Sequence, residues 1–364
     1  TNYRDRYRHL AEIRTVFTVH NLSYQGIRPL DGDASSLAAW FHNLNADEDR
    51  IRDPRFHDCV NPMAAAIRLA DKVSTVSPTY AEEICLPSTP ETGFIGGEGL
   101  EADLVAARDD GRLSGVLNGC FYDKPLGRRP GWQKIRQMIE TQLDEWRAAQ
   151  PDNDAHQTAL LQLERLPKRR PTHVLTSICR LVPQKASLLL ADIGDGRSAL
   201  QHISAELGRK GVILILGSGD PDLEALMLEQ VKQTSNVLFL HGYSETLAAP
   251  LYRAGDLFLM PSSFEPCGIS QMLAMRAGQP CVVHGVGGLK DTVEHNVTGF
   301  VFDGATASEQ SKGFVQATHD ALQMRAENPI RWQQICSAAM QQRFDWKSSA
   351  RQTIQTLYGE VNDS

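Results

Sequence analysis

Short apolar runs alternate with stretches of helical periodicity along most of the chain. Runs rich in β-branched residues at 15–19 and 72–76 predict strands, and the patterns at 61–70 and 79–84 predict helices. Each of these helices begins near a proline, a residue that suits the first helical turn. A further strand and a turn are expected at 111–119. Strands that alternate with helices in this way are typical of parallel α/β folds.

A second series of the same kind begins at Thr172. It predicts strands at 172–178, 212–217, 236–241, 256–260, 280–283 and 300–302. Helices are expected between them, at 187–208, 221–232, 245–254, 268–277 and 288–294. Because each helix returns the chain to the start of a parallel strand, the loops that follow the strands meet at one edge of the sheet. Ligands of doubly wound folds bind at that edge.

Polar, helix-prone sequence separates the two series. We interpret residues 131–170 as a helical connection between an N-terminal domain at 1–130 and a C-terminal domain at 171–343. The remaining residues, 344–364, have the pattern of an amphipathic helix and are expected to cross back onto the first domain. The predicted fold class is therefore α/β, with two doubly wound domains built on parallel sheets.

Composition and charge narrow the possible functions. With 364 residues, of which 41% are hydrophobic, the chain can bury a large core and is long enough for two domains. The formal net charge is −7, and the basic block at 168–170 precedes a predicted strand, so nucleic acid is a poor candidate for the main partner. No apolar run approaches the roughly 20 residues that span a bilayer. The 7 cysteines form no CxxC pair, which indicates reduced thiols in a cytoplasmic protein.

A glutamate and a pair of glycines mark the loops at the expected ligand-binding edge. Glu265 lies in the loop Phe-Glu-Pro-Cys-Gly at 264–268, just after the apolar run at 256–260. Gly287 and Gly288 open the predicted helix that follows the next strand. Such an arrangement can hold sugar hydroxyls on one side and a phosphate at a helix N-terminus on the other. The plainer alternatives are a glutamate that caps a helix and an ordinary glycine turn.

Two cations follow the predicted strand at 172–178. Arg180 and Lys185 lie in the segment Arg-Leu-Val-Pro-Gln-Lys. Arginine offers a fork of donors to a phosphate and lysine offers a point charge, although position alone fits a surface pair equally well. A second glycine loop, Gly-Ser-Gly-Asp at 217–220, opens a helix, and there an ordinary tight turn explains the sequence as well as a ligand does.

Several motifs resemble, in the same order along the chain, those of nucleotide-sugar glycosyltransferases, and specifically those of bacterial glycogen (starch) synthases. Residues 20–26 are similar to the H-N-L-x-Y-Q-G motif of that family, and Asn118 lies in a segment similar to its L-N-G turn. Residues 180–186 resemble S-R-L-x-x-Q-K-G, with Ala186 in place of the last glycine, and residues 264–300 resemble the donor-sugar loop. The similarity extends over nearly the whole chain.

This resemblance implies a fold and a reaction. The fold is of the GT-B type, in which two Rossmann-like domains face a cleft, with the first domain incomplete here and the C-terminal domain binding the nucleotide sugar. The reaction is transfer of glucose from ADP-glucose to the non-reducing end of an α-1,4-glucan such as glycogen, with retention of configuration. ADP-glucose is then the donor substrate, and no cofactor is expected.

The family motifs also imply the residues of the site. The catalytic residues that they indicate are His20, Arg180, Lys185 and Glu265. The donor-binding residues that they indicate are Asn118, Tyr243, Cys267, Gly268, Gly287 and Gly288. For His20 a structural role, and for Tyr243 core packing, are the plainer alternatives. The histidines lack the spacing of metal ligands, so we expect a metal-independent mechanism in which cations neutralise the diphosphate.

The sequence departs from the family pattern at several positions. Many related glycosyltransferases carry a second glutamate at the position of Leu273, and a threonine is frequent at the position of Val286. The family also has a Lys-x-Gly-Gly-Leu loop that nothing in residues 1–20 matches. Because the chain begins at Thr1 without a methionine, we expect it to be part of a longer protein.

Three alternative functions stay open at this point. One is a transferase of the same fold that uses UDP-glucose, because base preference cannot be read from these motifs. The second is a glucan phosphorylase, which requires a lysine that forms a Schiff base with pyridoxal phosphate, and no lysine here has a suitable context. The third is a non-catalytic or truncated module that binds a nucleotide or a glucan without turnover.

Overall fold

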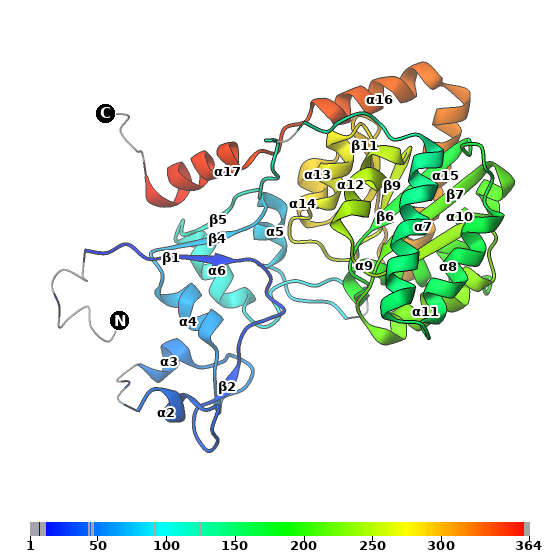
Figure 1. The fold of residues 1–364 in the computed structure, drawn as a ribbon. Coiled ribbons are helices and arrows are strands. Elements are labelled where there is room, and N and C mark those ends of the chain that lie inside the picture. Colours follow the sequence, from blue (N-terminus) through cyan, green and yellow to red (C-terminus); the bar gives the residue numbers. More distant parts are fainter. Residues whose placement is uncertain are drawn as a thin grey trace. The chain divides into compact units, whose positions relative to one another are not determined.

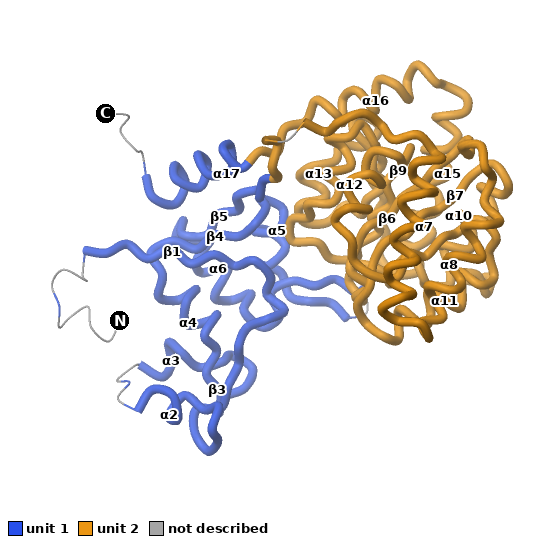
Figure 2. Tube along the Cα trace, in the orientation of Figure 1, with its two compact units in different colours: residues 1–119, 346–364 blue, residues 120–345 orange. Residues whose placement is uncertain are grey.

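The computed structural model describes residues 7, 12–42, 44, 47–90, 92–123 and 125–359. The chain divides into two compact units (Figure 2). Unit 1 comprises Thr1–Gly119 and Trp346–Ser364, and unit 2 comprises Cys120–Asp345. Among the described residues, no helix is both long and apolar enough to cross a membrane.

Unit 1 is built on a three-stranded parallel sheet in the order β1-β4-β5. Its strands are β1 (Val16–Val19), β4 (Lys72–Thr75) and β5 (Leu113–Gly115), with a small antiparallel pair formed by β2 (Arg28–Pro29) and β3 (Cys59–Val60). Its helices are α2 (Leu37–Trp40), α3 (Glu48–Ile51), α4 (Pro62–Leu69), α5 (Pro78–Glu83), α6 (Glu101–Asp109) and α17 (Trp346–Thr353), the last continuing into a π-helical turn at Ile354–Tyr358. The strands and helices predicted for this region are confirmed within one or two residues.

The helix starts of unit 1 follow directly from its sequence. The Asn61 side chain caps α4 by accepting from the Ala64 N–H, and the Ser77 side chain caps α5 in the same way. A proline occupies the first helical position in both cases, where its missing N–H costs nothing. The buried Tyr80 hydroxyl accepts from the Leu22 N–H at 3.1 Å and so fixes the segment that follows β1.

Unit 2 contains a six-stranded, fully parallel sheet in the order β11-β10-β9-β6-β7-β8. Its strands are β6 (His173–Ile178), β7 (Gly211–Gly217), β8 (Val237–His241), β9 (Leu257–Met260), β10 (Cys281–His284) and β11 (Gly299–Phe302). All six agree with the predicted positions. The chain places β7 and β8 on one side of β6 and the later strands on the other, so the strand order reverses between β6 and β9.

Helices cover both faces of this sheet (Figure 1). They are α7 (Trp132–Ala149), α8 (Asp154–Arg165), α9 (Pro183–Leu190), α10 (Ala199–Leu207), α11 (Pro221–Lys232), α12 (Glu245–Ala254), α13 (Ser270–Arg276), α14 (Gly287–Thr292), α15 (Ala307–Glu327) and α16 (Pro329–Gln341), with a 3₁₀ turn at Gly208–Lys210. The fully buried strand β7 alternates between the two layers. Leu214 packs with α7, α8 and α12, whereas Ile213 packs with α9, α10 and α15. Burial on both faces explains its uninterrupted apolar sequence.

Two predictions about this region differ from the structure. The single helix expected at 187–208 is two helices, α9 and α10, because Asp192 accepts from the backbone N–H groups of residues 194–196 and Ser198 starts a new helix with a capping box. The connection expected at 131–170 is instead part of unit 2, where Ile135 and Ile139 of α7 are fully buried against the sheet.

Candidate functional site

The strand order of unit 2 brings two predicted site segments to one place. Arg180 and Lys185 follow β6, and Glu265 follows β9. Because β6 and β9 are adjacent and parallel, both segments leave the same edge of the sheet at the point where the strand order reverses. Crevices at such points are the usual ligand sites of doubly wound folds.

A buried ion pair joins these two segments. The Lys185 Nζ atom lies 2.8 Å from Oε2 of Glu265, whose exposed fraction is only 6%. The Ser262 hydroxyl donates to the same oxygen at 3.3 Å. The backbone reinforces the pair, since the Ser263 N–H donates to the Gln184 carbonyl at 2.9 Å. Removal of either charged partner would leave the other charge buried and unpaired, which is costly.

Glycines allow the loop after β9 to pack closely against α14. A Cβ atom on Gly288 would lie 2.3 Å from the Cys267 carbonyl oxygen, so no other residue fits there. Gly287 and Gly268 have φ of +43° and +75°, which favours glycine at both positions. This close approach explains the Gly-Gly pair by packing, and Cys267 is buried beneath it.

The N–H group of Gly288, whose expected role as a phosphate donor stays a prediction, has a partner within the protein. Its N–H group donates to the Glu265 carbonyl at 3.1 Å, so in this structure the amide holds the Glu265 loop. Val286, at the N-cap of α14, makes no side-chain hydrogen bond to the helix. The start of α14 therefore positions the carboxylate loop.

Sequence reasoning missed His284, a residue of β10 that contacts the loop after β9 at Ser262. Its Nδ1 atom lies 3.2 Å from the Ser262 carbonyl, to which a ring N–H can donate, and its ring stacks on Phe302 at 5.1 Å. Burial lowers the pKa of His284 below its ordinary value, which favours the neutral ring. The register of β10 against β9 brings this histidine next to Ser262, and no local sequence motif predicts that contact.

A pocket of about 710 Å³ begins at the carboxyl ends of β6, β7 and β8 and extends along α12 and α13 to Arg253 and Arg276. Arg180 and Tyr243 line it together with Gly217, Ser218 and Gly242. Tyr243 has an exposed fraction of 78%, which excludes the alternative of core packing. The volume falls within the range of small-ligand sites.

The glycine loop after β7 is required by close packing. A Cβ atom on Gly217 would lie 2.0 Å from the Cys179 carbonyl oxygen, and one on Gly219 would lie 2.3 Å from that of Leu181. The Leu181 N–H donates to the Ser218 carbonyl at 2.9 Å. These contacts hold the Arg180 segment against the loop that lines the pocket.

Unit 1 carries the two remaining predicted site residues. His20 follows β1 and is exposed, and Asn118 follows β5, with its N–H donating to the Val76 carbonyl at 3.2 Å. Both residues lie at the carboxyl edge of the three-stranded parallel sheet. Their role in a ligand site stays a prediction.

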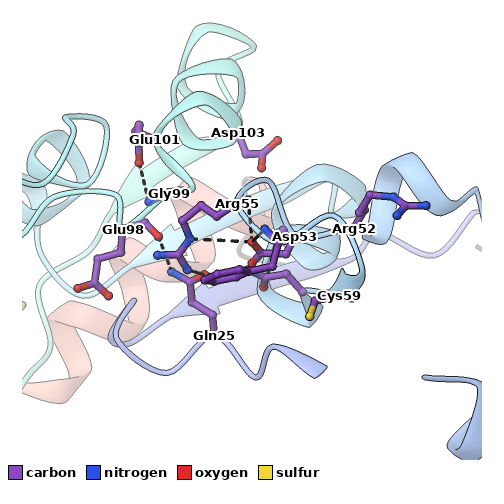
Figure 3. A network of polar contacts seen from close by, with 12 residues as sticks. Gln25, Arg52, Asp53, Arg55, Cys59, Glu98, Gly99, Glu101 and Asp103 are labelled. Atoms are coloured by element: carbon purple, nitrogen blue, oxygen red, sulfur yellow. Dashed lines mark hydrogen bonds and ion pairs between the residues drawn. The ribbon is translucent and has the colours of Figure 1, made fainter. Parts of the chain in front are cut away.

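Gln25, from the same motif as His20, belongs to a polar network within unit 1 (Figure 3). Its side-chain oxygen accepts from Arg55 at 3.1 Å and from Asn61 at 2.7 Å, and its Nε2 donates to the Glu98 carbonyl at 3.0 Å. The buried Asp53 carboxylate accepts from Asn61 at 2.7 Å. This part of the motif therefore fixes the backbone after β1 to the rest of unit 1.

The structure shows no candidate metal centre in its described part. Among those residues no group of three or more His, Cys, Asp or Glu side chains is arranged to hold an ion. All 7 cysteines are described and none forms a disulfide, and burial raises the pKa of the Cys179 thiol beside Arg180. Metal independence remains an expectation from the sequence.

Comparisons with known proteins match this architecture over almost the whole chain. The starch synthase catalytic domain matches residues 1–106, and glycosyl transferases group 1 matches residues 145–331. A glycogen synthase of Deinococcus radiodurans is 36% identical over 352 residues, which is 96% of this chain and 69% of the relative. A glycogen synthase of Streptococcus equi is 36% identical over 353 residues, covering 93% of this chain and 65% of the relative. The chain thus spans about two thirds of the length of these relatives.

Solved structures show the same fold. The catalytic domain of starch synthase IV from Arabidopsis thaliana, bound to ADP and acarbose, is 28% identical and matches with a TM-score of 0.70, covering 98% of this chain and 69% of that chain. HepE from Anabaena, in complex with UDP-glucose, is 18% identical, has a TM-score of 0.53 and covers 97% of this chain and 74% of that chain. The second match supports the GT-B fold alone.

Proposed function

The chain belongs to the glycogen and starch synthase family of glycosyltransferases, and from this premise we propose that it serves transfer of glucose from ADP-glucose to the non-reducing end of an α-1,4-glucan. The observation that carries the proposal is the buried Lys185–Glu265 pair at the strand-order reversal of unit 2. It lies at the edge of the sheet where Arg180 and Tyr243 line an open pocket.

The diphosphate of the donor requires cations as it leaves. When the bond between C1 of glucose and the phosphate oxygen breaks, the electron pair stays on ADP, which gains one negative charge. We propose that two cations of the segment that follows β6 stabilise that charge. They are Arg180, which is exposed at the pocket, and Lys185, five residues further along the chain. Charge-assisted hydrogen bonds of this kind are worth about 1.5–3 kcal/mol each.

Glu265 is the proposed partner of the transferred sugar. The hydrogen bonds that its carboxylate makes to described residues fall on Oε2, so Oε1 is the atom that would accept from a glucose hydroxyl. Lys185 supplies the counter-charge to this carboxylate in its buried position. A fixed negative charge there also favours the positive charge that develops at C1 during transfer.

The glucan acceptor supplies the oxygen of the new bond and the proton that the leaving phosphate takes up. The hydroxyl oxygen at C4 of the terminal glucan residue forms the new bond to C1, and its proton passes to the leaving phosphate. For His20 and Asn118 the proposal rests on the family motifs and on their shared place at the carboxyl edge of the unit 1 sheet. Retention of configuration, independence of metals and a cytoplasmic location belong to the same proposal.

A transfer assay tests the proposed function. Glycogen is incubated with the protein and with ¹⁴C-labelled ADP-glucose or UDP-glucose, with and without EDTA. We expect label in glycogen from ADP-glucose, undiminished by EDTA. Label from UDP-glucose alone would replace the donor in the proposal, and loss of transfer in EDTA would reject metal independence. Binding of ADP without any transfer would favour the alternative of a nucleotide-binding module.

A further inference from the structure

Unit 2 contains a second pocket at the opposite edge of its sheet. It has a volume of about 600 Å³ and is lined by Arg129, Arg253 and Arg325 together with Asp256, Gln333 and Cys336. Asp256 directly precedes β9, whereas Glu265 follows that strand. This pocket, called the amino-edge pocket below, therefore lies at the amino ends of the strands, away from the Lys185–Glu265 pair.

The charge around the amino-edge pocket is unbalanced. Oδ1 of Asp256 contacts three guanidinium groups, those of Arg129 at 2.8 Å, Arg170 at 2.8 Å and Arg325 at 3.2 Å. The other carboxylate oxygen, Oδ2, accepts from the Val174 N–H at 2.9 Å. One negative charge thus faces three positive charges, in a protein whose formal net charge is −7.

Arginine side chains at the wall of the amino-edge pocket have guanidinium N–H groups that make no hydrogen bond to a described residue. The hydrogen bonds that Arg129 makes to described residues all come from Nη2, while its side chain is half exposed. Arg253 donates from Nη1 to the Leu126 carbonyl, and its Nε atom is buried without a hydrogen-bond partner in the described part of the chain. Arg253 also lines the pocket that contains Arg180, so Arg129 and Arg325 are the cations that line the amino-edge pocket alone.

These observations indicate the chemistry of an occupant. Guanidinium forks match phosphate oxygens in geometry and charge, and several of them together favour an anion with more than one negative charge. The pocket volume suits a small molecule rather than a macromolecule. We propose that the amino-edge pocket is a second anion site of this protein, which binds a small molecule carrying a phosphoryl group through Arg129 and Arg325.

The test is calorimetric titration of the chain with inorganic pyrophosphate and, separately, with inorganic phosphate, at matched ionic strength. Arg129→Gln removes a wall cation, and Gln333→Glu adds a negative charge at an exposed wall position. Each variant should weaken pyrophosphate binding about tenfold, because each disturbs one charged contact. Gln333 makes the test independent of the Asp256 ion pairs, and thermal unfolding of each variant checks that the fold is intact.

Matched controls lie one residue away from each change. Arg128→Gln removes the same charge and Gln334→Glu adds the same charge, but neither residue lines the amino-edge pocket. We expect wild-type binding in both controls and an unchanged affinity for ADP in all four variants. Equal losses in variants and controls, no pyrophosphate binding at all, or binding abolished only by Arg180→Ala would each overturn the proposal. Failure of ADP to bind would count against the proposed donor site. The pyrophosphate titrations would still test the amino-edge pocket.

Discussion

The two ends of strand β9 carry carboxylates that are equally buried and differently paired. Asp256, before the strand, is 8% exposed, and Glu265, after it, is 6% exposed, so burial does not distinguish them. Asp256 is surrounded by three arginines and a backbone N–H, whereas Glu265 has one lysine and one serine hydroxyl. Both carboxylate oxygens of Asp256 are bound by the protein, whereas within the described residues the Glu265 carboxylate makes its hydrogen bonds through Oε2 alone.

The difference also concerns the side of the sheet on which chemistry is expected. Glu265 lies where the strand order reverses, at the carboxyl ends of the strands. Asp256 lies at the amino ends, where the arginines leave an excess of positive charge. We therefore propose sugar transfer at the carboxyl end of β9 and anion binding without turnover at its amino end.

The largest effect is expected at the carboxyl end. Glu265→Gln keeps the shape and removes the charge, and we expect kcat for glucose transfer to fall about 10³-fold, because the lost charge acts on the transition state. The affinity for ADP, which contains no glucose, should stay within about threefold. Steady-state kinetics and ADP titration measure the two quantities. Parallel losses in both would make Glu265 a simple binding residue.

A somewhat smaller loss is expected for the cation after β6. Arg180→Ala should lower kcat by about 10²-fold and weaken ADP binding about tenfold, since one charge-assisted contact to the diphosphate is lost. Arg180 is exposed, so the free energy of unfolding should not change. The matched control is Arg197→Ala, an exposed arginine paired with Asp195. Wild-type kcat in Arg180→Ala would remove this residue from the mechanism.

At the amino end the expected effect is on stability and not on turnover. Asp256→Asn leaves three guanidinium groups without their counterion, and we expect the free energy of unfolding in urea to fall by about 2–3 kcal/mol, less than for a fully buried pair because Arg129 is half exposed. The kcat of the folded variant should stay within about threefold of wild type. A loss of kcat comparable to that of Glu265→Gln would contradict a purely structural role for Asp256.

The smallest expected effect is a difference in acid sensitivity. Burial lowers the pKa of His284, so the fold disfavours its protonated form, and the stability that it contributes is present above pH 6.5 and decreases as the pH falls below that value. For Asp256, burial acts to raise the pKa, but Arg325 and Arg170 outweigh it and hold the pKa below 3.8, so its contribution is lost only below that pH. We predict that His284→Gln shows a shallower loss of unfolding free energy between pH 7 and pH 5. An unchanged slope would contradict this account of the loop behind Glu265.

The sequence predicted the elements well where local signals were strong. Apolar runs located all six strands of unit 2, and the prolines near the starts of the helices predicted at 61–70 and 79–84 located the starts of α4 and α5. The false single helix at 187–208 had a visible counter-signal, because glycines at 194 and 196 and the cap residue Ser198 interrupt the pattern. Helical periodicity was given too much weight there.

The candidate site was predictable only in part. The family motifs predicted Arg180, Lys185 and Glu265 as site residues, and their roles stay predictions. The contact between Lys185 and Glu265 depends on β6 and β9 being neighbours, which only the strand order determines. The same holds for His284 behind Ser262 and for the arginines that meet at Asp256. The use of the Gly288 amide within the loop is likewise a matter of tertiary packing.

Calorimetric titration with ADP decides whether the donor site lies at the carboxyl end of β9 and not at its amino end. ADP is titrated by calorimetry into wild-type protein, Arg180→Ala and Arg129→Gln. We predict that ADP binds the wild-type protein, binds Arg180→Ala about tenfold more weakly, and binds Arg129→Gln with unchanged affinity. Weaker ADP binding in Arg129→Gln with no change in Arg180→Ala would place the nucleotide at the amino edge and contradict the claim.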